Sequence, residues 1–139
     1  KISLQRKFWG RKMRYWTFDV CGLIADFEKN KRTLGAIQEC MRVANGYYEN
    51  PIGTTSRGDW EQYLKVLELR KNEYQMYVDM VVLGLNDLPE IERLVLEHWL
   101  IDHWNEVEIV NGCGIKNLEE LKRFKMIALT KFTNIVMPN

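Results

Sequence analysis

The sequence predicts an all-α protein, with an N-terminal pair of helices followed by a C-terminal helix-turn-helix. Two observations predict this fold class. Apolar residues recur every three or four positions along most of the chain, and turn-forming residues interrupt that spacing at residues 45–58 and 111–117. Ile2 and Leu4 alternate as in a strand, but the aromatic residues that follow do not keep this period.

Length and composition limit the number of domains. The chain has 139 residues, 46% of them hydrophobic, which suffices for one core but not for two large ones. We expect a basic aromatic arm at residues 1–16, a helical lobe at 17–87 with its loop at 45–58, and a helix-turn-helix lobe at 88–139. No apolar run approaches the roughly 18–20 residues of a membrane span, so no membrane partner is expected.

The arm at residues 1–16 carries six Lys or Arg and no acid, whereas residues 87–108 carry seven acids and only Arg93 as a base. One surface is therefore suited to phosphate and another to a basic partner. In the arm, the basic residues interleave with large aromatic residues, as in nucleic-acid contacts. The alternative is an arm whose aromatic side chains dock on the core. The candidate phosphate contacts are Arg6, Lys7, Arg11, Lys12 and Arg14.

From Thr17 to about Ala44 the apolar spacing predicts helix, with Thr17 or Asp19 as the N-cap. The charged residues 28–32 interrupt the stripe and mark either a helix break or a solvated face. Residues 45–58 hold three glycines and a proline, which predicts a linker loop. Gripping a ligand or a nucleic-acid strand is the alternative, although the loop lacks a GxxxxGK phosphate cradle.

Ser56 or Asp59 is expected to cap a second long helix, from Trp60 to about Leu85. A near-heptad apolar stripe runs along it and requires another helix to pack on. Packing against residues 17–44 is the expected solution, and the seam of a homodimer is the alternative. The stripe consists of Trp60, Tyr63, Leu64, Leu67, Tyr74, Tyr77, Val78 and Val81.

Residues 88–132 organise the C-terminal lobe. Pro89 predicts a helix starting near Leu88, and Glu90 and Glu92 would lie near the positive end of its dipole. A short helix with Trp104, Val107, Ile109 and Val110 on one side must stop at the glycine-rich residues 111–114. A basic helix then starts near residues 116–117, with its apolar face at Leu118, Leu121, Phe124, Ala128, Leu129, Phe132 and Ile135. Two short helices across a glycine turn, the second basic, are what a major-groove reader requires.

Neither the cysteines nor the histidines have the spacing of a metal site. Cys21, Cys40 and Cys113 are an odd number without CxxC spacing, which predicts free thiols in a reducing cytosol. His98 and His103 are turned about 140° from each other on a helix, so packing against tryptophans is the expected role. No catalytic motif is present. We expect no enzymatic activity, no cofactor and no metal.

The segments LPEIERLVLEHWL, WNEVEIVNGCGIKNLEELKR and ALTKF resemble the fourth-region helix-turn-helix of bacterial sigma factors. That frame reads Leu-Pro-x-x-x-Arg-x-Val-Leu, a short helix ending in Leu-Gly-Ile, and a recognition helix closing on Ala-Leu-x-x-Leu. The resemblance covers about a third of the chain. With one extra residue after Ile115, the matching positions are Leu88, Pro89, Arg93, Val95, Leu96, Ile109, Gly114, Ile115, Ala128, Leu129 and Phe132.

The whole layout is similar to the ArpU-type family of phage and prophage regulators of Gram-positive bacteria. This resemblance implies a sequence-specific DNA-binding transcription regulator, an activator of phage late or lysis-type genes, in the cytoplasm of a bacterial host cell. Its partners would be double-stranded DNA and bacterial RNA polymerase. The expected DNA contacts are Trp104, Asn105, Lys116, Asn117, Glu119, Glu120, Lys122, Arg123 and Lys125.

The sequence departs from the sigma frame at the turn and at the start of the recognition helix. The turn NGCGIKN is longer and richer in glycine than usual. Glu119 and Glu120 would face phosphates unfavourably, although a glutamate can accept a hydrogen bond from cytosine N4. The alternative function is therefore a sigma-like interaction module that binds RNA polymerase or another phage or host protein without reading DNA.

Overall fold

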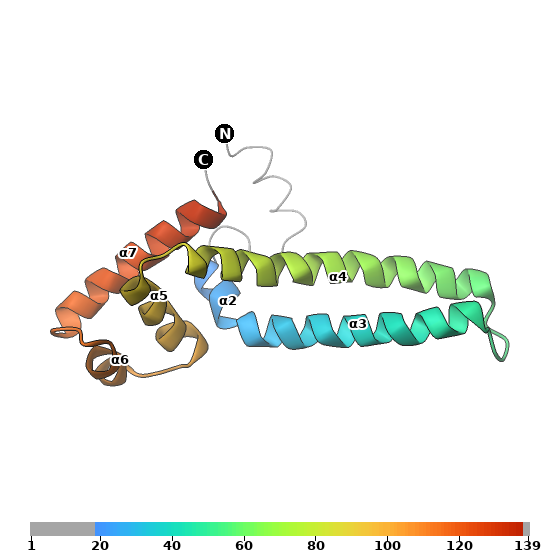
Figure 1. Cartoon of the computed structure of the whole chain (residues 1–139), viewed down its shortest axis with the longest axis horizontal. Helices are drawn as coiled ribbons and strands as arrows, with labels where there is room; N and C mark the ends of the chain where they lie inside the picture. The colour runs from blue at the N-terminus through green and yellow to red at the C-terminus, as the bar shows by residue number, and fades with distance from the viewer. Residues whose placement is uncertain (1–18, 138–139) are drawn as a thin grey trace. The chain divides into compact units, whose positions relative to one another are not determined.

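The computed structural model describes residues 19–137, and this part of the chain contains helices and turns but no strand, so the all-α prediction is confirmed (Figure 1). The arm at residues 1–16 and the N-cap candidate Thr17 lie outside the described residues. The helices are α2 (Val20–Ala25), α3 (Phe27–Glu49), α4 (Arg57–Asn86), α5 (Glu90–Leu96), the π-helix η1 (Glu97–Ile101), α6 (Glu106–Cys113) and α7 (Leu118–Val136).

The chain forms two compact units, whose boundaries fall within α3 and α4. One unit, Lys29–Val78, is a hairpin of these two long helices. The other unit combines the described residues before Lys29 with those from Asp79 onward. Residues 19–28 and 79–87, which the sequence analysis assigned to the N-terminal lobe, therefore belong to the same unit as α5, η1, α6 and α7.

In the hairpin unit, α3 and α4 run antiparallel and pack on each other (Figure 1). Ile37, Ala44 and Leu67 form the buried centre of the interface, with Met41, Trp60, Leu64 and Tyr74 packed around them. Near the loop, the rings of Tyr47 and Trp60 stack with centroids 5.0 Å apart. Four members of the predicted stripe of α4 thus pack on α3 within one chain, as expected, whereas Tyr63 is 43% exposed.

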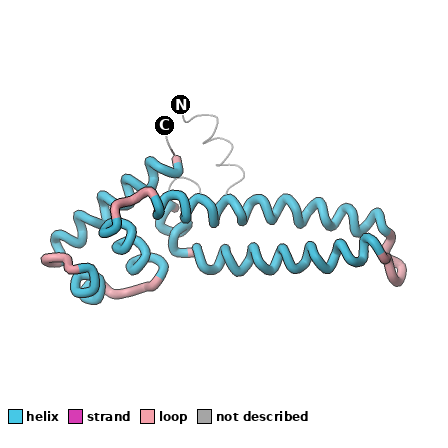
Figure 2. The backbone as a smooth tube through the Cα atoms, viewed as in Figure 1, coloured by secondary structure: helices cyan, strands magenta, loops and turns pink. Residues whose placement is uncertain are grey.

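The loop between the long helices is shorter than predicted (Figure 2). Helix α3 continues to Glu49, and α4 already begins at Arg57, so the prediction of a loop over residues 45–58 is wrong at both ends. Asn45 and Gly46 are poor helix formers, but tertiary packing overrides such weak propensities. The buried Ala44 and the Tyr47–Trp60 stack hold this last part of α3 in the helix.

Side chains form hydrogen bonds with backbone groups at both ends of this loop. The Asp59 backbone N–H donates to Ser56 Oγ at 3.1 Å, and the Ser56 N–H donates to Asp59 Oδ2 at 3.4 Å. The two predicted cap candidates thus act together as a reciprocal cap. Arg57 donates to the carbonyls of Tyr48 at 2.8 Å and Glu49 at 3.1 Å, groups that a helix C-terminus leaves unpaired.

The break in the first helical stretch lies before the charged residues 28–32. Asp19 caps α2, with its Oδ1 accepting from the Gly22 N–H at 3.0 Å. Helix α2 ends at Ala25, and the next helix begins at Phe27. The charged residues are therefore inside α3, where Glu28, Lys29, Lys31 and Arg32 are exposed. The solvated-face interpretation holds for them.

In the second unit, α5, α6 and α7 enclose a core of Val95, Ile109, Ile115 and Leu121. Helix α2 contacts η1 and α7. Glu92 lies in the first turn of α5, as predicted, but it is only 8% exposed, and its Oε2 lies 3.1 Å from Lys131 Nζ. This ion pair connects α5 to α7.

All three cysteines are free, as the sequence indicates. Burial raises the pKa of the Cys113 thiol, and burial together with the Asp19 carboxylate raises the pKa of Cys21. A raised pKa favours the protonated form of both thiols. Cys40 is exposed on the hairpin. Across residues 19–137, no helix has the length and hydropathy to span a membrane.

Gly84 allows the end of α4 to approach Phe132, which is fully buried. A Cβ at position 84 would lie 2.3 Å from Phe132 Cε2. We expect Gly84→Ala to lower the free energy of unfolding by about 1–3 kcal/mol, the usual effect of overpacking. Gly35→Ala is the matched control, because nothing lies within 4 Å of its added Cβ. This control should instead stabilise α3 by about 0.5–1 kcal/mol. Chemical denaturation measures both, and equal effects would contradict the packing argument.

Candidate nucleic-acid interface

Helix α6 begins with a reciprocal cap built from Asn105 and Glu108. Asn105 Oδ1 accepts from the Glu108 N–H at 2.8 Å, and Glu108 Oε1 accepts from the Asn105 N–H at 2.8 Å. Two of the unpaired N–H groups at this end are thereby satisfied. Trp104 lies before the helix rather than in it, because the cap fixes the helix start at Glu106. The side-chain oxygen of Asn105 is thus engaged within the protein.

Gly114 ends α6 in the left-handed conformation, with φ of 67°, which favours glycine. The following Ile115 N–H donates to the Val110 carbonyl at 2.9 Å, and the Ile115 side chain is buried in the core. Asn117 then caps α7 through Oδ1, which accepts from the Glu120 N–H at 2.8 Å. The predicted end of the short helix and the predicted start of the next one are both confirmed.

Trp104 and His98 form a stacked pair, with centroids 3.7 Å apart and planes 5° from parallel. His98 Nδ1 lies 2.8 Å from Asp102 Oδ2, which holds the imidazole against the indole. Gly112 lets Trp104 approach α6, since a Cβ there would meet the ring at 2.7 Å. The expected packing role of His98 is confirmed. No group of metal-binding side chains occurs among residues 19–137.

The side of α7 that faces solvent carries Glu119, Lys122, Arg123 and Met126, all exposed. Lys116, in the turn before α7, is also exposed. Arg123 forms an ion pair with Glu120 at 3.8 Å, and its side chain is 72% exposed. Glu120 therefore neutralises part of the positive charge on this face, whereas Lys122 adds to it.

Lys125 differs from the other predicted DNA contacts. Its Nζ lies 3.3 Å from Glu106 Oε2 on α6 and 4.4 Å from the centroid of the Trp99 ring. The Lys125 side chain is only 17% exposed, so its charge serves to hold α6 and α7 together. Sequence spacing does not predict this pair, because Glu106 and Lys125 are 19 residues apart and lie on different helices.

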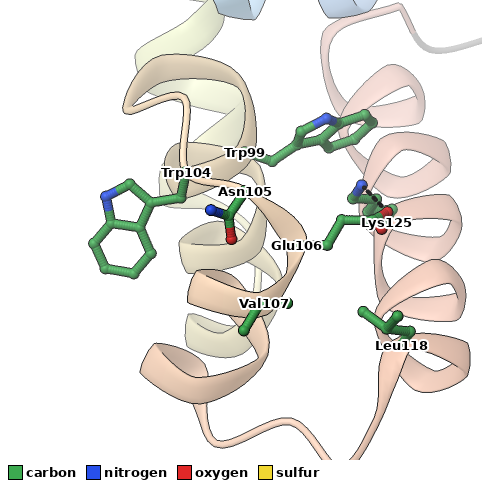
Figure 3. Close-up of a pocket in the computed structure, with 7 residues that line it drawn as sticks. All are labelled: Trp99, Trp104, Asn105, Glu106, Val107, Leu118 and Lys125. Carbon is green, nitrogen blue, oxygen red and sulfur yellow. Dashed lines mark hydrogen bonds and ion pairs between the residues drawn. The ribbon is translucent and has the colours of Figure 1, made fainter.

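An open pocket of about 520 Å³ lies between α6 and α7 (Figure 3). Trp99, Trp104 and Asn105 line it together with the Glu106–Lys125 ion pair, which crosses from one helix to the other. Val107 on α6 and Leu118 on α7 complete the lining, and they are 61% and 47% exposed. The pocket thus offers an apolar rim beside a neutralised charge pair, a surface that suits an apolar side chain more than an ion.

Comparisons with family models, with curated proteins and with solved structures give no match to this chain.

The structure thus divides the predicted contact residues into groups. Lys116, Glu119, Lys122 and Arg123 are exposed at the start of α7 or just before it. Asn105 and Asn117 cap helices, Trp104 packs on His98, and Lys125 pairs with Glu106. The candidate phosphate contacts of the arm, residues 6–14, lie outside the described residues.

We expect Lys125→Ala to lower the free energy of unfolding by roughly 1 kcal/mol, because it removes a partly exposed ion pair and a cation–π contact. Lys122→Ala is the matched control on the same helix, and the exposed position predicts a change within about 0.5 kcal/mol. Thermal denaturation of both variants measures this difference. A double-mutant cycle with Glu106→Ala isolates the pair, and zero coupling energy would show that it does not stabilise the α6–α7 contact.

Proposed function

We propose that the protein is a sequence-specific DNA-binding transcription regulator in which α7 enters the major groove. The observation that carries this proposal is the exposed pair Lys122 and Arg123 in the second turn of α7, on a helix that is capped, packed and preceded by a short turn. Helix-turn-helix proteins read bases with the first turns of the second helix. In this arrangement Lys122 and Arg123 would contact bases or nearby phosphates, and Lys116 a phosphate.

The stable orientation of α7 supports a reading role. Leu121, Ala128 and Phe132 are fully buried along one side of α7, so the opposite side is held facing outward. The Glu92–Lys131 pair joins α7 to α5, and the Glu106–Lys125 pair joins it to α6. A reading helix requires such support, since base contacts depend on side chains placed to within a fraction of an ångström.

The acids at the start of α7 restrict which contacts are favourable. Glu120 is paired with Arg123, so its charge is already compensated within the helix. Glu119 is exposed and would be repelled by phosphate, but it can accept a hydrogen bond from cytosine N4. Glu106 and Glu108 occupy the first turn of α6. They make that helix end unfavourable for phosphate, and we therefore assign DNA contact to α7 and the turn before it.

A second function, docking on RNA polymerase or another protein without reading DNA, is favoured by the apolar rim of the pocket. Val107 and Leu118 are more exposed than most apolar side chains of this unit. The acids of residues 87–108 add a surface that suits a basic partner. This function predicts a wild type that binds RNA polymerase but selects no DNA site, and a folded Val107→Ser, Leu118→Ser variant that no longer binds RNA polymerase.

The test of DNA reading starts from duplexes selected by the wild-type protein from a random library. We expect Lys122→Ala together with Arg123→Ala to weaken binding to the selected site at least about thirtyfold, since each base contact contributes roughly 1–3 kcal/mol. Thermal unfolding should not change, because both side chains are exposed. Gel shifts at several salt concentrations measure the affinity and the phosphate contribution.

The matched control removes the same charge from the hairpin unit, with Lys29→Ala and Arg32→Ala on the exposed side of α3. This control should bind the selected site as the wild type does. Failure to select any duplex, or equal affinities for the two double variants, would contradict the proposed role of α7.

A further inference from the structure

One stripe of α4 in the hairpin unit is not used by the packing against α3. It consists of Asp59, Tyr63, Val66 and Arg70, whose spacing places them on one side of the helix. All four are exposed; of the two apolar residues, Tyr63 is 43% exposed and Val66 is 52% exposed. This stripe lies beside the face of Leu67 and Trp60 that contacts α3, so it extends the apolar surface of the hairpin.

The apolar surface continues onto α3. Cys40 and Val43 line a hollow of about 290 Å³ together with Tyr63 and Trp60, so these residues share one side of the hairpin. Val43 is 42% exposed, and Cys40 is exposed as well. A hairpin of two helices has little core of its own, and such small units commonly gain stability by association. Four helices packed together would cover this side.

The charge order of the stripe indicates what covers it. Along α4 the stripe reads acidic, aromatic, aliphatic and basic, from Asp59 to Arg70. Placed antiparallel against the same stripe of another molecule, each Asp59 faces an Arg70, and each Tyr63 faces a Val66. A two-fold axis requires such a self-complementary surface, because every contact then occurs twice. An antiparallel pairing that is displaced by one helical turn would lose both ion pairs.

We propose that this side of the hairpin is a self-association surface, and that its occupant is the same side of a second copy of the chain, with the two α4 stripes antiparallel. The two central apolar pairs would be closed off from water. The ion pairs Asp59–Arg70 would lie at the ends of the contact and set its register. This surface differs from the core stripe of α4, which packs on α3 within one chain.

Charge reversal tests the pairing in the full chain, by sedimentation equilibrium without DNA. The wild type should reach the mass of two chains at micromolar concentrations. Arg70→Glu and Asp59→Arg each place like charges opposite each other twice, and each should weaken the dimer at least about tenfold. An equimolar mixture of these two variants should dimerise as the wild type does, because the mixed dimer has one wild-type Asp59–Arg70 ion pair and one pair with reversed signs.

Two further variants keep the test decisive. Val66 takes no part in the helix cap that Asp59 forms. The Val66→Lys variant should therefore stay folded, as measured by circular dichroism, and have the mass of a monomer. Lys65→Glu, exposed on another side of α4, makes a similar charge change and should leave the dimer intact. A monomeric wild type, a mixture that fails to dimerise, or equal weakening by Lys65→Glu and Arg70→Glu would overturn the proposal. The Lys122→Ala, Arg123→Ala variant should remain dimeric, so this proposal and DNA reading can fail separately.

Discussion

The burial of Ile115 is the constraint on which the C-terminal unit depends. Its side chain lies in the core with Val95, Ile109 and Leu121, while its N–H closes the end of α6 by donating to Val110. Only three residues separate the left-handed Gly114 from the first residue of α7, so anchoring one of them fixes both helices. The exposed face of α7 is thus set by an apolar contact on its other side.

Ion pairs between helices contribute differently to this unit. Glu92 is nearly buried, and its carboxylate would cost several kcal/mol of desolvation without Lys131, so the pair mainly avoids a penalty. Glu106 is half exposed and its pair with Lys125 is worth less, but Lys125 also covers the Trp99 ring. Both lysines lie on α7. Two of the positive charges on the helix with the proposed DNA contacts are thus used to hold that helix against α5 and α6.

Local patterns predicted the helices well, and contacts between distant residues were predicted poorly. The capping residues Asp19 and Ser56 were predicted, because a cap depends on neighbours within three residues. The extension of α3 to Glu49 was not, because it depends on Tyr47 stacking on Trp60. For the same reason, sequence spacing placed Lys125 among the exposed cations, whereas its partner on α6 removes it from that surface. Exposure of Lys122 and Arg123 followed directly from the helical period.

The proposed DNA reading and the proposed self-association place different demands on the two units. A single reading helix makes few base contacts, and most of its affinity is electrostatic and shared by any sequence. Joining two such units makes the second binding event intramolecular, which raises affinity for a paired site without any new contact to DNA. The self-complementary stripe of α4 lies outside the unit that carries α7. If both proposals hold, substitutions in the hairpin would therefore change the requirement for paired sites while the proposed base preference of α7 stays the same.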